Sequence, residues 1–152
     1  MSKLLRLKPL WVFSIFAFLD LICIGMGMGV PIFCILFGFL VGWFMVRYIT
    51  TTMTSTPQVF RRVLLYAIIT AAVTLLGMIV IWVPSIPMLF NPAQDLANYG
   101  IPMILYEPRA SFIGWMVLMI LISPFLQLLT TLFGSHLALM GWMRLGESYQ
   151  LQ

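Results

Sequence analysis

Between Leu10 and Val46 the chain is almost continuously apolar, and this run is too long to cross a membrane as one helix. A straight helix over the run would measure roughly 55 Å at about 1.5 Å per residue, whereas the hydrocarbon core of a bilayer is ~30 Å thick. The run must therefore turn back on itself. Three glycines and a proline mark the turn: Gly25, Gly27, Gly29 and Pro31. Glycine permits positive φ angles and proline suits the first turn of a following helix, so a tight helical hairpin is predicted.

Composition indicates a membrane location for the whole chain. Of 152 residues, 62% are hydrophobic and 8% are charged, and the mean hydropathy is +1.09. Soluble domains average roughly 25% charged residues, because their surfaces need polar groups. The aromatic content of 14% excludes intrinsic disorder. We therefore interpret the chain as an integral membrane protein whose apolar excess faces the lipid bilayer.

Four transmembrane helices are predicted in a single domain over residues 1–152. The predicted spans are about 9–26, 30–46, 63–83 and 112–140, with a proline-rich outer loop over about 84–111. The third helix is expected to begin with Thr56 as its N-cap and Pro57 at its first helical position. Ser123 and Pro124 predict a bend in the fourth helix, because proline cannot donate a helical hydrogen bond.

Basic residues indicate the orientation of the helices. With the N-terminus in the cytosol, seven of the eight Lys and Arg side chains lie inside and Arg109 alone lies outside. Tryptophan and tyrosine, which favour membrane interfaces, occur at both ends of the predicted spans. The net charge of +4 thus comes from basic residues that orient the helices in the membrane. The sequence has no basic stripe of the kind typical of nucleic-acid binding. We predict a multi-pass protein of the cell membrane with both termini in the cytosol.

The first span has an alternative interpretation. Three basic residues before an apolar run that ends in small residues also resemble a secretory signal peptide. Asp20 inside the run argues against a signal peptide, as does the second apolar span, which follows at once and needs a helix to pack against.

The predicted outer loop contains five prolines yet remains apolar, which favours a position on the membrane surface. Within it, the segment from Asn91 to Gly100 predicts a short helix, with Asn91 as the cap and Pro92 at the first position. A re-entrant segment is the alternative, although Asp95 makes deep insertion costly. We expect this segment to form an interfacial cap over the bundle.

Asp20 is the leading candidate for a functional site. Counted from Pro9, it lies about 16 Å along the first helix, near the bilayer midplane. An acid at this depth costs about 2.5 to 3.5 kcal/mol on insertion scales, so it usually faces the bundle interior, is paired, or exchanges a proton. Two interpretations remain open: a proton or cation site, or a protonated carboxyl that hydrogen-bonds a Ser or Thr on a neighbouring helix. The sequence places no basic side chain at the same depth.

Small and polar residues recur at helical spacing in the other spans. In the fourth span they share one face: Ser123, Gln127, Thr130 and Gly134. The third span offers a matching face: Ala67, Thr70, Ala71, Thr74 and Gly77. The second span has a row at four-residue spacing: Cys34, Gly38 and Gly42. These rows favour close helix packing, with four glycines as packing positions: Gly38, Gly42, Gly77 and Gly134. The alternative is a polar pathway to Asp20, with five candidate residues: Ser123, Gln127, Thr130, Thr70 and Thr74.

The sequence supports neither a metal site nor a cofactor site. His136 is the single histidine, and the acidic residues lie at other depths or in loops, which leaves no zinc ligand set. Two outcomes are open for Cys23 and Cys34, which lie symmetrically about the predicted turn: a disulfide, or two buried thiols. The sequence contains no nucleophile elbow and no nucleotide-binding motif, so no enzyme activity is predicted.

Two functional hypotheses from different classes follow. The first is a non-catalytic subunit or scaffold of a membrane complex, or a homo-oligomer, because small-residue faces and 12 methionines suit helix association. The second is a small proton- or cation-coupled transporter that uses Asp20.

Overall fold

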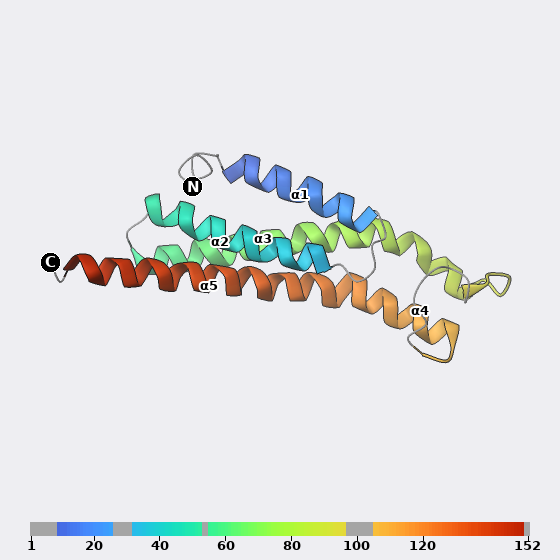
Figure 1. The fold of residues 1–152 in the computed structure, drawn as a ribbon. Helices are drawn as coiled ribbons and strands as arrows, with labels where there is room; N and C mark the ends of the chain where they lie inside the picture. Colours follow the sequence, from blue (N-terminus) through green and yellow to red (C-terminus); the bar gives the residue numbers. More distant parts are fainter. Residues whose placement is uncertain (1–8, 26–31, 53–54, 97–104, 151–152) are drawn as a thin grey trace.

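The computed structural model describes residues 9–25, 32–52, 55–96 and 105–150, and helices are the regular elements in these segments (Figure 1). The first two helices are α1, Pro9–Gly25, and α2, Ile32–Thr52. Helix α3, Thr56–Trp82, continues directly into the 3₁₀ helix η2, Val83–Phe90. The last helical stretch consists of three elements in succession: α4, Pro108–Val117, the π-helical turn η4, Leu118–Ile122, and α5, Ser123–Gln150.

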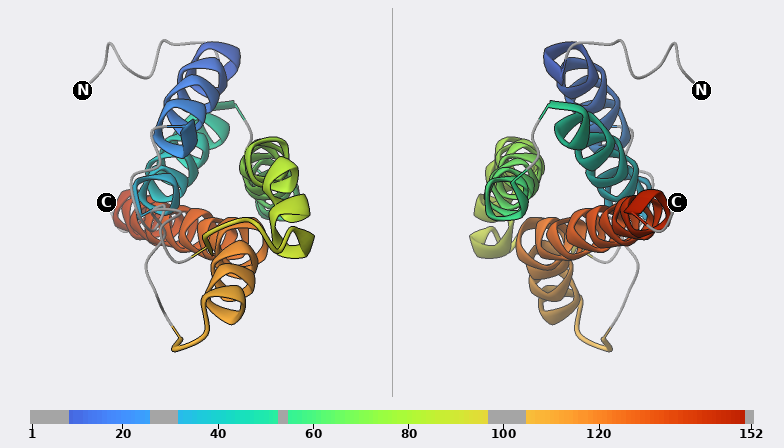
Figure 2. Two further views of the ribbon diagram at one scale, coloured as in Figure 1. Left: turned by 90° about the vertical axis from the view of Figure 1, so that its right-hand side faces the viewer. Right: turned by 90° about the vertical axis from the view of Figure 1, so that its left-hand side faces the viewer.

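The helices form an elongated bundle in which α2, α3 and α5 run side by side and α1 lies along the outside (Figure 1). The most extensive contact joins α2 to α5, and α1 packs on both α2 and α3. Seen along the bundle, α4 turns away from the direction of α5 (Figure 2). The predicted all-helical fold with four helices is confirmed.

Three of the described helical stretches are long and apolar enough to cross a membrane: Ile32–Thr51, Pro57–Phe90 and Pro108–Met143. The apolar helix Leu10–Gly25 is shorter. By helix length and hydropathy, this is a multi-pass membrane protein. A membrane-spanning helix needs at least about 17 residues, so the 17-residue α1 lies at the lower limit of that range.

Three of the described helical stretches extend beyond the predicted spans, whereas α1 lies within its own. Helix α2 continues to Thr52 instead of ending near Val46, and the Thr50 and Thr51 hydroxyls donate hydrogen bonds to carbonyl oxygens one turn earlier, at 2.9 and 2.7 Å. The outer loop is also shorter than predicted, because helical structure replaces loop residues at both of its ends. Helical structure continues through η2 to Phe90 and resumes at Pro108, which is well placed in a first helical turn.

Ser55, rather than Thr56, is the N-cap of α3. Its backbone is extended, with φ −87° and ψ 120°, and its carbonyl accepts the first helical hydrogen bond from the Val59 N–H at 3.2 Å. Pro57 therefore lies at the second helical position. The prediction was wrong by one residue because two adjacent short hydroxyl residues are equally suited to the cap by type.

The predicted helix from Asn91 to Gly100 does not form over residues 91–95. The Asn91 side chain does accept a hydrogen bond from the Ala93 N–H at 3.1 Å, as an N-cap would, but the backbone after it forms a local turn and does not continue as a helix. Residues 97–100 lie outside the described part of the chain, as do Gly27, Gly29 and Pro31 of the predicted hairpin turn. Gly25 is the last residue of α1.

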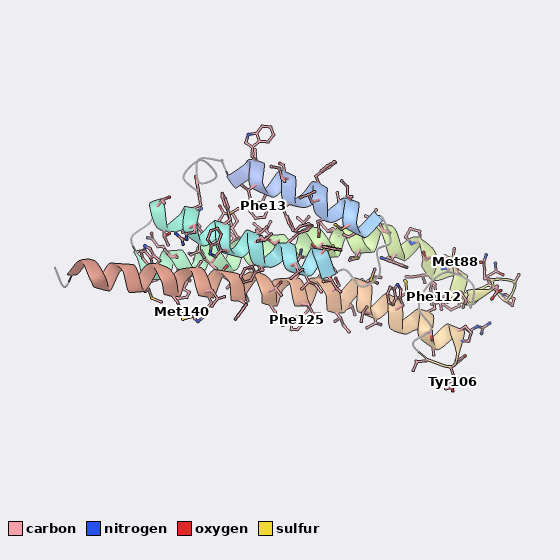
Figure 3. The ribbon with its side chains drawn as sticks, viewed as in Figure 1. Phe13, Met88, Tyr106, Phe112, Phe125 and Met140 are labelled. Atoms are coloured by element: carbon pink, nitrogen blue, oxygen red, sulfur yellow. The ribbon has the colours of Figure 1, made fainter. Side chains whose placement is uncertain are left out.

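A hydrophobic cluster joins η2, the following turn and α4. Leu96 is buried against Phe112 and Met116, with Met88 packed beside them. Met88 and Phe112 lie close together at one end of the bundle (Figure 3). The segment after η2 therefore covers the start of α4. The last turns of α2 and the first turns of α3 lie at the opposite end of the bundle (Figure 1). We call this opposite end the basic end, because these turns carry Arg47, Arg61 and Arg62.

The interruption predicted at Ser123 and Pro124 takes the form of a π-helical turn. Pro124 has no N–H to bond the carbonyl four residues earlier, and the Ser123 N–H reaches back five residues to the Leu118 carbonyl. Figure 2 shows the helix changing direction at this turn. The bend therefore follows from a missing backbone donor, as a proline within a helix predicts.

Candidate functional site

Asp20 lies on the face of α1 that packs against α3, and its side chain is completely buried. The Thr74 hydroxyl on α3 donates a hydrogen bond to Asp20 Oδ2 at 2.5 Å. Thr74 also lies within reach of the Thr70 carbonyl, at 3.5 Å. Within the described part of the chain, Asp20 Oδ1 has no hydrogen-bond partner. The acid is thus joined to a neighbouring helix through one of its two oxygens.

The close fit of α1 on α3 explains the burial of Asp20. A Cβ atom built on Gly77, one turn after Thr74, would lie 3.1 Å from Ile24 Cδ1 and 3.2 Å from Leu21 Cδ2. The missing side chain lets the two helices approach, which removes Asp20 and Thr74 from the lipid together. At the other end of α1, the Phe13 and Tyr66 rings stack with centroids 5.6 Å apart.

The polar residues of α5 form a second group, at the contact with α2. Gln127 Nε2 donates to the Cys34 carbonyl at 2.9 Å, and the Thr130 hydroxyl donates to the Ile35 carbonyl at 2.7 Å. Both side chains thus bind main-chain oxygens in the first turns of α2. In lipid, such interhelical hydrogen bonds stabilise helix pairs by about 0.6 kcal/mol on average.

Three glycines make the contact between α2 and α5 close. A Cβ on Gly38 would lie 2.6 Å from Thr131 Oγ1, and a Cβ on Gly42 would overlap the Thr131 carbonyl. A Cβ on Gly134 would lie 2.5 Å from the Phe39 carbonyl oxygen, so the approach is tight from both helices. Rows of small residues thus allow the two backbones to come near each other.

The pairing of these faces differs from the prediction. The polar row of α5 was expected to meet the small-residue face of α3, but its interhelical hydrogen bonds go to α2. Thr74 and Gly77 on that face of α3 contact α1 instead. The reason is steric, because α2 and α5 carry complementary small residues along the line where they cross.

Sequence analysis missed two residues of this contact, Thr131 and Ser135. Both are buried, and their hydroxyls donate to the carbonyls four residues earlier, at 2.7 and 2.8 Å. Together with Gln127 they form a row at four-residue spacing, the same spacing as Cys34, Gly38 and Gly42 on α2. Matching this spacing between the two spans could have found them.

Cys34 lies between the two polar groups. Its thiol is 4.0 Å from the Asp20 main-chain oxygen, and its own carbonyl accepts the hydrogen bond from Gln127. Cys34 is completely buried, Cys23 is partly exposed, and both thiols are free. The structure therefore brings Asp20 and Gln127 to two sides of one residue of α2.

The remaining candidates lie apart from this arrangement. Ser123 is buried, and its hydroxyl has no partner among the described residues, whereas the Thr70 hydroxyl donates to the Tyr66 carbonyl at 2.7 Å. His136 is exposed on α5 and lines a groove to which Arg61 of α3 also contributes. The described residues contain no group of three or more His, Cys, Asp or Glu side chains that could hold a metal ion.

Comparisons of the chain with protein-family models, with characterised proteins and with solved structures find no match.

Proposed function

We propose that the chain is a non-catalytic subunit or scaffold of a membrane complex, formed with other membrane proteins or with copies of itself. The observation that supports this proposal is the use of polar groups within the bundle. Asp20 accepts a hydrogen bond from Thr74, and Gln127 and Thr130 bind carbonyl oxygens of α2. Each of these side chains connects two helices, as is expected of residues with a structural role.

The geometry of α1 favours association with a further helix. The predicted first span, about 9–26, lies near the lower limit of the ~17 to 25 residues that a membrane crossing needs. A helix shorter than the hydrocarbon thickness is accommodated by local thinning of the bilayer or by oligomerisation. The outward face of α1 is apolar, with Phe18 66% exposed. We therefore place the interface on this face.

The test is the assembly state after purification in a mild detergent. We expect a homo-oligomer or a stoichiometric second membrane protein, measured by native mass spectrometry and by light scattering after size exclusion. Phe18→Ala should weaken the association, whereas Phe125→Ala, an exposed apolar truncation on α5, should leave it unchanged. A folded monomer in several mild detergents and in lipid nanodiscs would contradict the proposal.

A proton- or cation-coupled transporter is the second candidate, because Asp20 Oδ1 is buried and has no partner in the described segments. This oxygen is a free acceptor at a depth where an acid is costly. Five residues are the candidates for a polar pathway to Asp20: Ser123, Gln127, Thr130, Thr70 and Thr74. In proteoliposomes, Asp20→Asn should abolish flux driven by a pH gradient, while Ser14→Ala on the exposed face of α1 should not. Flux that survives Asp20→Asn excludes this candidate.

A further inference from the structure

A groove runs between the first turns of α3 and the facing part of α5, near the basic end. Its volume is about 540 Å³, within the ~300 to 1,000 Å³ of small-molecule sites. Eight residues line it: Phe60, Arg61, Val63, Leu64, Leu132, Ser135, His136 and Leu139. The groove is separate from Asp20, and it meets the contact between α2 and α5 at Ser135.

The groove combines an apolar channel with a basic side chain at its rim. Val63 and Leu139 form a buried floor, while Phe60 and Leu64 are each 50% exposed at the sides. Arg61 is exposed and makes neither an ion pair nor a hydrogen bond with any residue the structure describes. His136, exposed on α5, adds hydrogen-bonding nitrogens beside it. A ligand that fits must therefore carry an alkyl chain and a negatively charged group.

The aromatic residues around the groove place it at the level of lipid headgroups. Val63 and Leu139 belong to a cluster against which Tyr48, Tyr66 and Trp142 pack. Tyrosine and tryptophan favour the boundary between hydrocarbon and water, where their apolar rings and polar atoms are both accommodated. We therefore expect Arg61 to lie near the level of the lipid phosphates.

A second hollow adjoins the first on the other side of α3. It measures about 790 Å³ and shares Arg61 and Leu64 with the groove, while Arg62 adds another exposed cation. Basic pockets beside transmembrane helices are typical binding sites for anionic headgroups. Two hollows that meet at one arginine match a molecule with one charged head and two chains.

We infer that this site binds one anionic phospholipid, with its phosphate paired to Arg61 and one acyl chain lying in the groove between α3 and α5. The adjoining hollow takes the second chain. The charge of the site selects anionic over zwitterionic lipid, and its apolar lining selects lipid over free phosphate. The inference does not depend on the proposed function, because it involves neither assembly nor Asp20.

The experiment measures lipid retention by native mass spectrometry of the purified full chain in detergent, supplied with equal amounts of phosphatidylglycerol and phosphatidylcholine. The wild type should retain one phosphatidylglycerol in several-fold preference to phosphatidylcholine. Arg61→Gln should weaken phosphatidylglycerol retention about fivefold, corresponding to roughly 1 kcal/mol for one basic side chain at an anionic surface. Arg47→Gln is the matched control. It removes the same charge at the same end of the bundle, where Arg47 lies over the Trp43 ring at 5.1 Å and outside the groove.

A second pair of variants tests the groove itself. Leu64→Trp should fill the groove and reduce lipid retention with the charge intact, whereas Leu76→Trp, at an exposed position of α3 away from the groove, should not. Circular dichroism and thermal unfolding establish that each variant is folded. Equal retention of both lipids by the wild type would overturn the inference. So would equal losses in Arg61→Gln and Arg47→Gln, unchanged retention in Leu64→Trp, or displacement of the lipid by inorganic phosphate alone.

Discussion

Gly42→Ala is expected to loosen the contact between α2 and α5. The new Cβ would overlap the Thr131 carbonyl and lie 2.8 Å from Ser135 Oγ. The serine hydroxyl can rotate, but the Thr131 carbonyl is backbone within α5 and cannot move without shifting the helix. Overpacking of this kind typically costs about 1 to 3 kcal/mol, and the better helix propensity of alanine returns about 0.5 to 1 kcal/mol. We expect a net loss of roughly 1 kcal/mol in the free energy of unfolding, and of about 2.5 kcal/mol at most.

Gly114→Ala on α4 is the matched control, because a Cβ there would have nothing within 4 Å. It carries the same change in helix propensity without a clash, so it should stabilise the protein by about 0.5 to 1 kcal/mol. The free energy of unfolding would be measured in mixed micelles by titration with a denaturing detergent, with circular dichroism as the signal. The two variants should therefore differ in sign. A Gly42→Ala protein as stable as Gly114→Ala would refute the close approach of α2 and α5.

Three further predictions follow from other parts of the structure. Asp20→Asn keeps an oxygen that can accept the Thr74 hydrogen bond, so its free energy of unfolding should change by less than about 1 kcal/mol; Asp20→Leu should lose up to about 2 kcal/mol. If the two variants are equally stable in the same assay, the hydrogen bond contributes nothing. Pro124→Ala restores a backbone donor and should remove the π-helical turn. The straighter helix would lengthen the distance between spin labels on α4 and α5. An unchanged distance would assign the bend to tertiary packing. In a cysteine-free background, Asp95→Cys should react with an impermeant thiol reagent from outside, and Ser55→Cys only after permeabilisation; the opposite pattern would reverse the predicted orientation.

Much of the fold is local and could be predicted from the sequence. Hydropathy predicts membrane-embedded helices because every backbone polar group in lipid must be satisfied within its own segment. The interruption before Pro124 is equally local, since the missing N–H is a property of one residue. The cap at Asn91 shows the limit of local signals. Its side chain makes the hydrogen bond expected of an N-cap, to the Ala93 N–H, yet the residues that follow form a turn and no helix.

The choice of partners among the helices was decided by the tertiary structure. All the spans present apolar surfaces, and lipid is as apolar as leucine, so hydropathy does not distinguish one neighbour from another. The sequence predicts that Asp20 is either a proton or cation site or a carboxyl bonded to a hydroxyl, and that Gly42 allows a close neighbour. That Thr74 is the hydroxyl and Thr131 the neighbour follows from which backbones can approach without a clash. Depth in the membrane is a property of each segment along the chain, whereas packing depends on the shapes of two helices together.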